Sequence, residues 1–400
     1  MPSQPVSQRQ DISSFLARDG LFESPDAPRI LISRLSAHGD VVQGLPLLDV
    51  LRAKWPNAHI GWLVERSAAS LLEGHPFIDQ LHVCQRKDWL RRLSTPMQWA
   101  KILQEISGFC REIRLTRYDV SLDVQGLLKS AIWPWVCGIP KRFGNKNARE
   151  RADIFYNYKL PPHPIDASTP AIDQYLSFAS ALGVSPDFPA LQNTHFTLPA
   201  ISEDTWQKVD ALFSTVSKDK PVVAVAPATI WPSKHWHQAH WYGLLKTLSE
   251  WDVSVVVLGA SNDMALVSQL LPQPLTANLY NFCGQTDLSD LYALFQKVDV
   301  LIGLDSAPLH IANAVASHTG KKPDIIALFG STAAERTGPV GERHRSLQTR
   351  LDCQPCFERI CPLGTHECMK ALSPNTVLEN LKRMLAAQKL FQPVIRRSAH

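Results

Sequence analysis

The sequence lacks a long apolar run and a secretory leader. No stretch reaches the roughly 18 consecutive apolar residues that a membrane-spanning helix needs. Residues 1–29 are largely polar, without the continuous apolar segment of a signal peptide. We therefore expect the protein to stay in the cytoplasm, where it could at most touch a membrane surface.

A large charge imbalance is also absent. The formal net charge is +4 and no long run of one sign occurs, which argues against a nucleic-acid partner. Eight cysteines in 400 residues are too few for a disulfide scaffold. Four of them are scattered and are interpreted as core residues: Cys84, Cys110, Cys137 and Cys283.

Size and composition predict more than one domain. A hydrophobic content of 45% over 400 residues exceeds what a single core usually holds. We predict a flexible extension over residues 1–27, an N-terminal domain over 28–190, a C-terminal domain over 200–388 and a tail over 389–400. The proline-containing stretch 185–200 is the expected linker.

Both halves of the chain alternate strand and helix patterns. The expected strands include 29–35, 59–64, 118–123, 222–226, 298–303 and 324–329, and the expected helices include 41–55, 171–182 and 205–217. Pro46 should kink the first of these helices. Strand, crossover helix and parallel strand form the unit of an open α/β sheet, so we predict this class for both halves.

The stretch 299–341 contains the strongest candidate site. A buried strand ends at the turn Asp305-Ser306, and a helix follows. Ser306 could cap that helix while its backbone amide and those of Ala307 and Leu309 face a phosphate. An ordinary capped turn is the alternative. A second turn, 330–332, at the end of the next strand favours the phosphate site because both turns lie on one sheet edge.

Two further residues stand at expected strand ends. Lys234 follows the strand 222–226 and could give a diphosphate a positive charge, although a plain surface lysine is the alternative. Asp40 follows the strand 29–35. It could simply cap the next helix, or it could act as a general base at the mouth of the sheet.

The region 86–117 is basic and amphipathic. Its basic residues are Arg86, Lys87, Arg91, Arg92, Lys101, Arg111, Arg114 and Arg117, interleaved with Trp89, Leu90, Trp99, Ile102 and Leu103. Such a region could lie against anionic lipid head groups, or it could be the solvated face of a packed helix.

These motifs also resemble a known family. GLDSAPLHIANAV with LFGSTAAERTGPVG resembles the C-terminal donor-binding signature of the heptosyltransferase family of glycosyltransferases, which build the inner core of bacterial lipopolysaccharide. SAHGDVVQGLP is similar to the family's N-terminal motif, and Lys234, Trp236 and Trp241 match its Lys-x-Trp-x-x-x-x-Trp pattern. The resemblance extends from Arg29 to about residue 385.

The resemblance implies a fold and a reaction. The fold would be the GT-B architecture, an α/β arrangement of two facing αβα Rossmann-like domains with an interdomain cleft. The enzyme would be an inverting glycosyltransferase that moves heptose from ADP-heptose onto a Kdo-lipid A acceptor, a lipid-linked oligosaccharide, at the cytoplasmic face of the inner membrane. Asp40 would be the catalytic base. The donor-binding residues would be Thr229, Lys234, Asp263, Asp305, Ser306, Ala307 and Leu309, although Asp263 does not match the family position of its acidic residue.

Two other segments resemble parts of the family that indicate which acceptor is used. DVQGLLKSA and NARERADIFYN resemble segments of the family members that add the first heptose, the heptosyltransferase I enzymes. Gln125, Lys141 and Arg142 could meet the phosphates and carboxylates of an acidic acceptor. The alternatives are a transferase with another sugar or acceptor, a nucleotide-sugar epimerase, or an inactive nucleotide-sugar-binding protein.

The last feature is a cysteine cluster within residues 353–368, made of Cys353, Cys356, Cys361 and Cys368. Thiolates at this spacing could bind a structural zinc or iron ion. Reduced thiols packed under the last helix are the alternative. By the family resemblance we expect catalysis to need no metal and no other cofactor.

Overall fold

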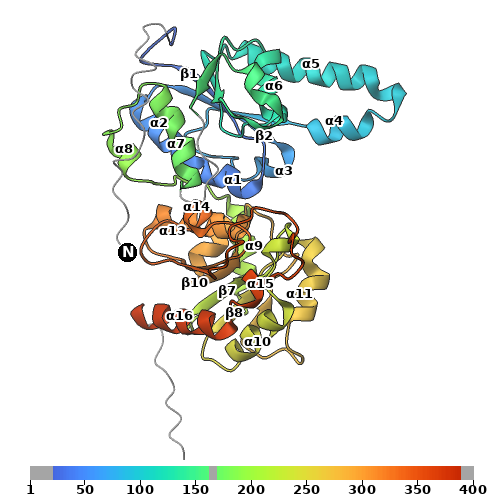
Figure 1. Cartoon of the computed structure of the whole chain (residues 1–400), viewed down its shortest axis with the longest axis vertical. Helices are drawn as coiled ribbons and strands as arrows, with labels where there is room; N and C mark the ends of the chain where they lie inside the picture. The colour runs from blue at the N-terminus through green and yellow to red at the C-terminus, as the bar shows by residue number, and fades with distance from the viewer. Residues whose placement is uncertain (1–20, 162–168, 389–400) are drawn as a thin grey trace, which may run out of the picture. The chain divides into compact units, whose positions relative to one another are not determined.

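The computed structural model describes residues 21–161 and 169–388 (Figure 1). The chain divides into two compact units, residues 1–200 and 201–400. Most of the expected N-terminal extension and the whole expected tail therefore lie outside the described residues.

The first unit is built on a six-stranded parallel sheet in the order β3-β2-β1-β4-β5-β6. Its strands are β1 (Arg29–Ser33), β2 (His59–Glu65), β3 (Gln80–Cys84), β4 (Val120–Asp123), β5 (Lys141–Asn145) and β6 (Tyr158–Leu160). Its helices are α1 (His38–Gln43), α2 (Leu45–Lys54), α3 (Arg66–Ala69), α4 (Arg86–Arg92), α5 (Trp99–Leu115), α6 (Leu128–Val136), α7 (Ala171–Ala181) and α8 (Pro189–Gln192), with 3₁₀ turns η3 (Pro96–Gln98) and η4 (Arg149–Phe155).

The second unit repeats this topology, with the strand order β12-β11-β10-β7-β8-β9. Its strands are β7 (Val222–Ala226), β8 (Ser254–Val257), β9 (Leu279–Asn281), β10 (Val300–Leu304), β11 (Asp324–Phe329) and β12 (Arg345–Gln348). Its helices are α9 (Glu203–Phe213), α10 (Gln238–Leu248), α11 (Met264–Leu270), α12 (Leu291–Leu294), α13 (Ala307–Thr319), α14 (Ala334–Thr337), α15 (Glu367–Lys370) and α16 (Pro374–Ala387), with 3₁₀ turns η5 (Pro232–Lys234), η6 (Ser261–Asp263) and η7 (Phe295–Lys297).

Both sheets reverse their strand order at one point. The first unit reverses between β1 and β4, and the second between β7 and β10. Ligands of open α/β sheets bind outside the carboxyl ends of the strands at such a point. The loops that follow β1 and β7 therefore lie at the expected ligand-binding edge of each unit.

The central strands owe their position to continuous apolar sequence. β7, β10 and β11 are buried along their whole length, because helices cover both faces of a parallel sheet. The sequence predicts β7 and β11 with the bounds that the structure has.

The helix expected over residues 41–55 is two helices. Its break lies at Gly44, between α1 and α2, and Pro46 occupies the first turn of α2, where its missing amide costs nothing. A Cβ atom at Gly44 would lie 3.0 Å from Cη2 of Trp62 in β2. The close approach of α1 and α2 to the sheet thus depends on this glycine, and the expected kink at Pro46 was wrong by two residues.

Residues 21–27, which the sequence assigns to the extension, pack on the first unit. Leu21 is buried, and its carbonyl accepts a 2.8 Å hydrogen bond from Nζ of Lys141. The rings of Phe22 and Trp55 meet edge to face, with centroids 5.4 Å apart. The amide of Glu23 donates to Oδ1 of Asp119 at 3.2 Å.

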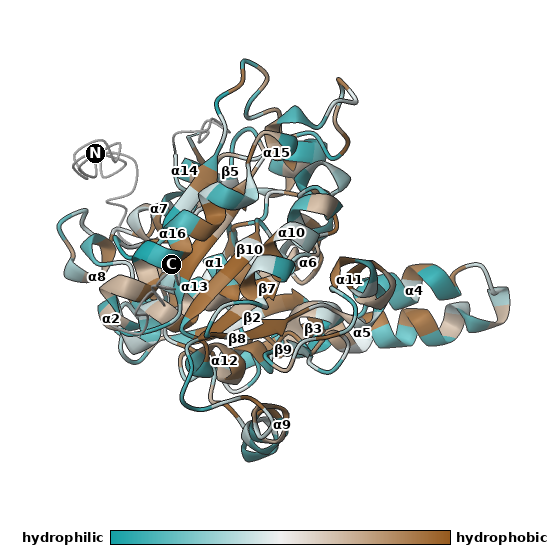
Figure 2. Ribbon diagram, turned by 90° about the horizontal axis from the view of Figure 1, so that it is seen from below, coloured by the Kyte–Doolittle hydropathy of each residue, from teal (hydrophilic) through white to brown (hydrophobic). Residues whose placement is uncertain are grey.

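One part of the first unit departs from the compact αβα arrangement. α4 and α5 run side by side and extend away from the sheet, as Figures 1 and 2 both show. We call residues 86–115, which include α4, η3 and α5, the arm. Over the residues that the structure describes, no helix has the length and apolar character to cross a membrane.

Candidate active site

Asp40 lies in the first turn of α1, directly beyond the carboxyl end of β1. Nη2 of the Arg34 guanidinium lies 2.5 Å from Oδ2 of Asp40, and the Asp40 side chain is 40% exposed. The same oxygen accepts a hydrogen bond from the amide of Ala37 at 3.3 Å. Asp40 therefore both closes its own helix turn and presents a carboxylate to solvent at the switch point of the sheet.

Arg34 is the buried charged partner of this carboxylate. Burial acts to lower the pKa of the Arg34 guanidinium, but the pKa is raised because the negative charge of Asp40 outweighs that effect. Nη1 of Arg34 also donates to the carbonyl of Val124 at 3.0 Å, and the guanidinium lies over the ring of Tyr175, 5.3 Å from its centroid. A buried cation held by three elements gives Asp40 a fixed position.

Gln125 connects β4 to the loop that carries Asp40. Its Oε1 accepts from the amide of Leu35 at 2.8 Å, and its Nε2 lies 3.4 Å from Oγ of Ser36. The buried Asp123 fixes Gln125 in turn, because Oδ1 of Asp123 accepts from the Gln125 amide at 3.0 Å. The structure thus brings Gln125 and Asp40 to one place, as the sequence analysis requires.

Lys141 and Arg142 are not part of that place. They begin β5, and the register pairs Lys141 with Val120 at the amino end of β4. Asp40 lies beyond the carboxyl ends of the strands, at the opposite edge. Nε of Arg142 donates to the carbonyl of Phe155 at 2.7 Å and Nη1 to that of Ile139 at 2.6 Å. The two basic residues hold the fold there, and the structure does not support their expected role in acceptor binding.

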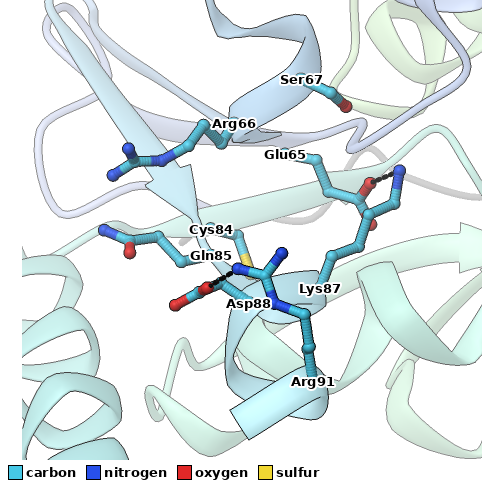
Figure 3. A pocket seen from close by; sticks show the side chains of 8 residues that line it. All are labelled: Glu65, Arg66, Ser67, Cys84, Gln85, Lys87, Asp88 and Arg91. Carbon is cyan, nitrogen blue, oxygen red and sulfur yellow. Dashed lines mark hydrogen bonds and ion pairs between the residues drawn. The ribbon is translucent and has the colours of Figure 1, made fainter.

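A pocket of about 540 Å³ lies at the carboxyl edge of the same sheet. Figure 3 shows its lining, which comes from the ends of β2 and β3 and from α3 and α4: Glu65, Arg66, Ser67, Cys84, Gln85, Lys87, Asp88 and Arg91. The loop of Asp40 contacts this lining, because Nε2 of His38 lies 2.9 Å from the carbonyl of Ser67.

Basic side chains gather around one buried acid in this pocket. Glu65 is 3% exposed, and Nη2 of Arg86 and Nζ of Lys87 lie 2.9 and 3.2 Å from its carboxyl oxygens. Burial acts to raise the pKa of Glu65, but these cations and Lys129 lower it. Burial also lowers the pKa of Lys129, whose Nζ contacts Oγ of Ser36. A network of fixed charges thus links the pocket to the Asp40 loop.

In the second unit, Lys234 meets Asp305 at the switch point between β7 and β10. Lys234 ends η5, which follows β7, and Asp305 follows β10. Nζ of Lys234 lies 2.7 Å from Oδ2 of Asp305 and 3.2 Å from its carbonyl oxygen. The ring of Trp231 covers the ammonium group, with its centroid 4.7 Å from Nζ. A lysine held in this way is a fixed positive charge rather than a mobile surface residue.

Asp305 is buried and fully paired. Oγ1 of Thr332 donates to Oδ2 at 2.7 Å, and Nε2 of His310 lies 3.2 Å from Oδ1. Burial acts to raise the pKa of the Asp305 carboxyl, yet the pKa is lowered below its usual range because His310 and Lys234 favour the charged form. The carboxylate therefore binds residues from η5, from α13 and from the turn after β11 at one edge of the sheet.

Ser306 begins α13 without acting as a side-chain cap. It is the N-cap residue, but its buried hydroxyl has no hydrogen-bond partner in the part of the chain that the structure describes. Within the same residues, the amides of Ser306 and Ala307 find no acceptor either. The Leu309 amide donates to the carbonyl of Ser306 at 3.0 Å, so it is not available for the predicted phosphate contact. Unpaired donors at a helix N-terminus suit an anion.

Thr229 and Asp263 lie along the same carboxyl edge. Thr229 follows β7, and its backbone contacts the ring of His235, whose pKa is lowered by burial. Asp263 ends η6, after β8, and its Oδ2 accepts from the amide of Ala260 at 2.8 Å. The structure thus brings five predicted residues to one edge: Thr229, Asp263, Lys234, Asp305 and Ser306. The Asp263 carboxylate, however, already accepts a hydrogen bond within its own turn.

The family assignment rests on much more of the sequence than these motifs. The pattern of glycosyltransferase family 9 (heptosyltransferase) matches residues 106–367, more than half of the chain. The chain belongs to this family. As a family member it is a glycosyltransferase, and the sequence prediction of the family is confirmed.

Individual relatives of this family 9 chain are distant. Lipopolysaccharide heptosyltransferase 1 of Pseudomonas aeruginosa is 24% identical over 91% of this chain and 100% of its own length. Among solved structures, the ADP-heptose lipopolysaccharide heptosyltransferase II of Escherichia coli is 21% identical and covers 90% of this chain and 99% of its own, with a TM-score of 0.70. Heptosyltransferase WaaC of E. coli with ADP-2-deoxy-2-fluoro heptose is 20% identical and covers 89% and 99%, with a TM-score of 0.65. The α/β fold of GT-B type is therefore confirmed.

Sequence reasoning missed two residues of the family 9 sites, Arg34 and His310, and it included the turn of Thr332 without its role as a partner of Asp305. Arg34 pairs with Asp40, and His310 and Thr332 hold Asp305. Arg34 directly follows β1 and lies six positions before Asp40. A basic residue next to an apolar strand could have indicated a partner for Asp40. His310 lies in α13 one turn after Ser306 and could have been found from the helix periodicity.

The cysteine segment of the family 9 chain packs against the donor-side loops. The amide of Phe357 donates to the carbonyl of Ser331 at 2.8 Å, and Oγ of Ser233 donates to that of Glu358 at 2.6 Å. Cys353 is exposed, and Cys356, Cys361 and Cys368 are half-buried. Over residues 21–161 and 169–388, no group of three or more His, Cys, Asp or Glu side chains is arranged to hold a metal ion. The structural zinc or iron ion therefore stays a prediction.

Proposed function

We propose that this chain is an inverting heptosyltransferase that moves heptose from ADP-heptose onto a Kdo-lipid A acceptor. The observation that carries the proposal is the arrangement of Lys234, Asp305 and Ser306, which joins a fixed cation to unpaired helix donors at the switch point. Relatives named for lipopolysaccharide heptose transfer support the choice of sugar and pathway.

The donor diphosphate would lie at the N-terminus of α13. Lys234 would supply a positive charge, and the amides of Ser306 and Ala307 with the Ser306 hydroxyl would donate hydrogen bonds. Negative charge grows on the diphosphate as it leaves the sugar, so donors fixed in advance stabilise the transition state more than the ground state. Asp305 keeps Lys234 in position between turnovers.

Asp40 would activate the acceptor. The acceptor hydroxyl oxygen forms a bond to the anomeric carbon while the bond from that carbon to the diphosphate oxygen breaks. The hydroxyl proton passes to the Asp40 carboxylate, and the electron pair of the broken bond leaves with ADP. A single displacement of this kind inverts the configuration at the anomeric carbon. The acid and the phosphate site come from different units, so the reaction requires both.

The acceptor would lie in the pocket beside the Asp40 loop. Arg66, Lys87 and Arg91 line it, and guanidinium and ammonium groups recognise phosphates and carboxylates. Gln125 belongs to the same edge of the sheet. This pocket takes the place that the sequence analysis gave to Lys141 and Arg142. An acceptor anchored in lipid would bring the protein to the cytoplasmic face of the inner membrane.

No metal or other cofactor is required in this scheme. Lys234 and the donors of α13 would carry the charge of the leaving group, which is the task of a divalent cation in other glycosyl transfers. The expected result is an initial rate that stays the same in a chelator such as EDTA.

The test is release of ADP by the purified protein from ADP-heptose, with and without Kdo-lipid A. The proposal expects release only with the acceptor. Conversion of the donor into another nucleotide sugar in the absence of acceptor, with no ADP released, would indicate an epimerase instead. If ADP-heptose is inert but another nucleotide sugar of a panel is consumed, the chain is a family member with a different donor.

A further inference from the structure

The tip of the arm exposes large apolar side chains. The five residues are Leu90 at 52% exposed, Leu93 at 45%, Met97 at 94%, Trp99 at 52% and Leu103 at 67%. They fall within 14 consecutive positions that include the turn between α4 and α5. Single exposed apolar residues are ordinary, but five large ones within so short a segment indicate an interaction surface.

This exposure belongs to an ordered structure. Nε1 of Trp89 donates to Oε2 of Glu105 at 3.0 Å, and the Arg92 guanidinium pairs with the same carboxylate, so α4 is tied to α5. Nε1 of Trp99 donates to the carbonyl of Leu93 at 2.9 Å and fixes the turn. The arm thus holds its apolar tip outward.

One face of α5 is buried and another is exposed. Ile102, Phe109 and Ile113 point into the core of the first unit and are buried. Trp99 and Leu103, four residues apart, share a different face that stays exposed. The packing of the arm on its own unit therefore does not use the tip.

Charge accompanies the apolar tip. Between positions 86 and 115 the arm has seven basic and three acidic residues, an excess of +4 that equals the formal net charge of the whole chain. Asp88 and Glu105 pair with Arg91 and Arg92, and Glu65 of β2 pairs with Arg86 and Lys87 at the base of the arm. Lys101 and Arg111 are exposed on α5. A cationic, apolar surface complements an anionic lipid bilayer, where apolar groups enter the acyl boundary and cations meet phosphates.

We propose that the arm docks the protein on an anionic membrane, with Leu90, Leu93, Met97, Trp99 and Leu103 inserted at the head-group boundary. The segment precedes the residues that match the family pattern, which begin at 106, so the tip is a feature outside that pattern. The lining of the acceptor pocket includes Lys87 and Arg91 of α4. Docking would therefore place that pocket next to the lipid surface.

This inference deepens the proposed function and rests on it only for the lipid-linked acceptor. Its test is sedimentation of the full-length protein with vesicles of phosphatidylcholine alone or mixed with phosphatidylglycerol, none containing lipopolysaccharide. The variant Met97→Ser with Leu103→Ser should lower partitioning into the mixed vesicles by about tenfold or more, because less apolar area enters the bilayer. Lys101→Gln with Arg111→Gln should lower it by roughly fivefold per charge, with a weaker salt dependence.

The control variant removes two exposed apolar side chains outside the arm. Ile154→Ser with Leu363→Ser, each 62% exposed, should leave partitioning unchanged. Equal binding by the Met97 and Leu103 variant, or no binding of the wild type to anionic vesicles, would overturn the proposal. A dimer in light scattering that this variant dissociates would assign the tip to a second copy and overturn it as well. Transfer to a deacylated, water-soluble acceptor should be the same in the tip variant, so loss of docking is separable from loss of chemistry.

Discussion

Asp40 stands at the switch point of its sheet with a buried guanidinium beside it, which makes it the strongest candidate base in the first unit. Asp40→Ala should lower the rate of heptosyl transfer by roughly 10²- to 10⁴-fold, the usual contribution of a positioned general base. ADP affinity, measured by calorimetry, should not change, because the groups that would bind the diphosphate belong to the second unit. Asp252→Ala, at an exposed acid, serves as the control. An unaltered transfer rate would remove Asp40 as the base.

Lys234 is the fixed cation of the phosphate site. Lys234→Ala should weaken ADP binding by roughly 1.5 to 3 kcal/mol, the range for hydrogen bonds to charged groups, so Kd should rise at least about tenfold. Lys220→Ala, which removes a lysine paired with Asp252 at the surface, should leave Kd unchanged. Equal affinity in the Lys234 variant would place the diphosphate elsewhere.

Asp305 gives stability that depends on pH. Its pKa is lowered in the folded protein, so its contribution is complete above the unfolded pKa of about 3.9 and is lost as the pH falls toward the folded value. Asp305→Asn should lower the free energy of unfolding by about 3 to 5 kcal/mol at neutral pH, because it breaks a buried charge pair.

Urea unfolding of both proteins at neutral pH and in steps below about pH 4 measures this dependence. The difference in the free energy of unfolding between the wild type and Asp305→Asn should become smaller as the pH falls. A difference that stays constant into the acid range would mean that the Asp305 charge does not stabilise the fold.

The sequence could predict the site residues that stand at strand ends, but not their partners. Asp40, Lys234 and Asp305 follow apolar strands, a local signal that the chain order reveals. Thr332 lies 27 residues after Asp305, and only the parallel pairing of β10 and β11 brings them together. The Leu309 amide was wrongly expected to be free because the turn bond to Ser306 is a matter of backbone geometry.

At the scale of elements, the sequence predicts the middle of each sheet better than its edges. β7 is apolar throughout and β11 is apolar after Asp324, so both strands could be predicted from the sequence. β12 is an edge strand and β5 lies next to the edge strand β6, and both contain basic and polar residues whose side chains are partly exposed. The amino-terminal position of Lys141 and Arg142 could not be recognised while β5 itself was missed.

The cysteine segment is an element whose role can be measured directly. Its hydrogen bonds to Ser233 and Ser331 tie it to the loops of the phosphate site. If it binds the predicted structural ion, elemental analysis of protein purified without chelator should find zinc or iron in equimolar amount, and removal of the ion should lower Tm. Substoichiometric metal with an unchanged Tm would leave four reduced thiols in a packed loop.

The whole molecule consists of two units with one topology, and each presents its chemistry where the strand order reverses. The first unit presents an acid next to a basic pocket, and the second a cation next to unpaired helix donors. This division matches a reaction with two substrates, an acceptor that must lose a proton and a donor that must lose a diphosphate. Similarity of the two topologies could be predicted from the strand patterns, but their strand orders needed the structure.

Mass spectrometry of Kdo-lipid A after incubation with ADP-heptose tests the central claim most directly. The account predicts an acceptor that carries one additional heptose, with an inverted anomeric configuration by NMR, and no product with Asp40→Ala. An acceptor that stays unmodified while the wild-type protein binds ADP-heptose would contradict heptosyl transfer to this acceptor and would direct the search to other acceptors of the same family.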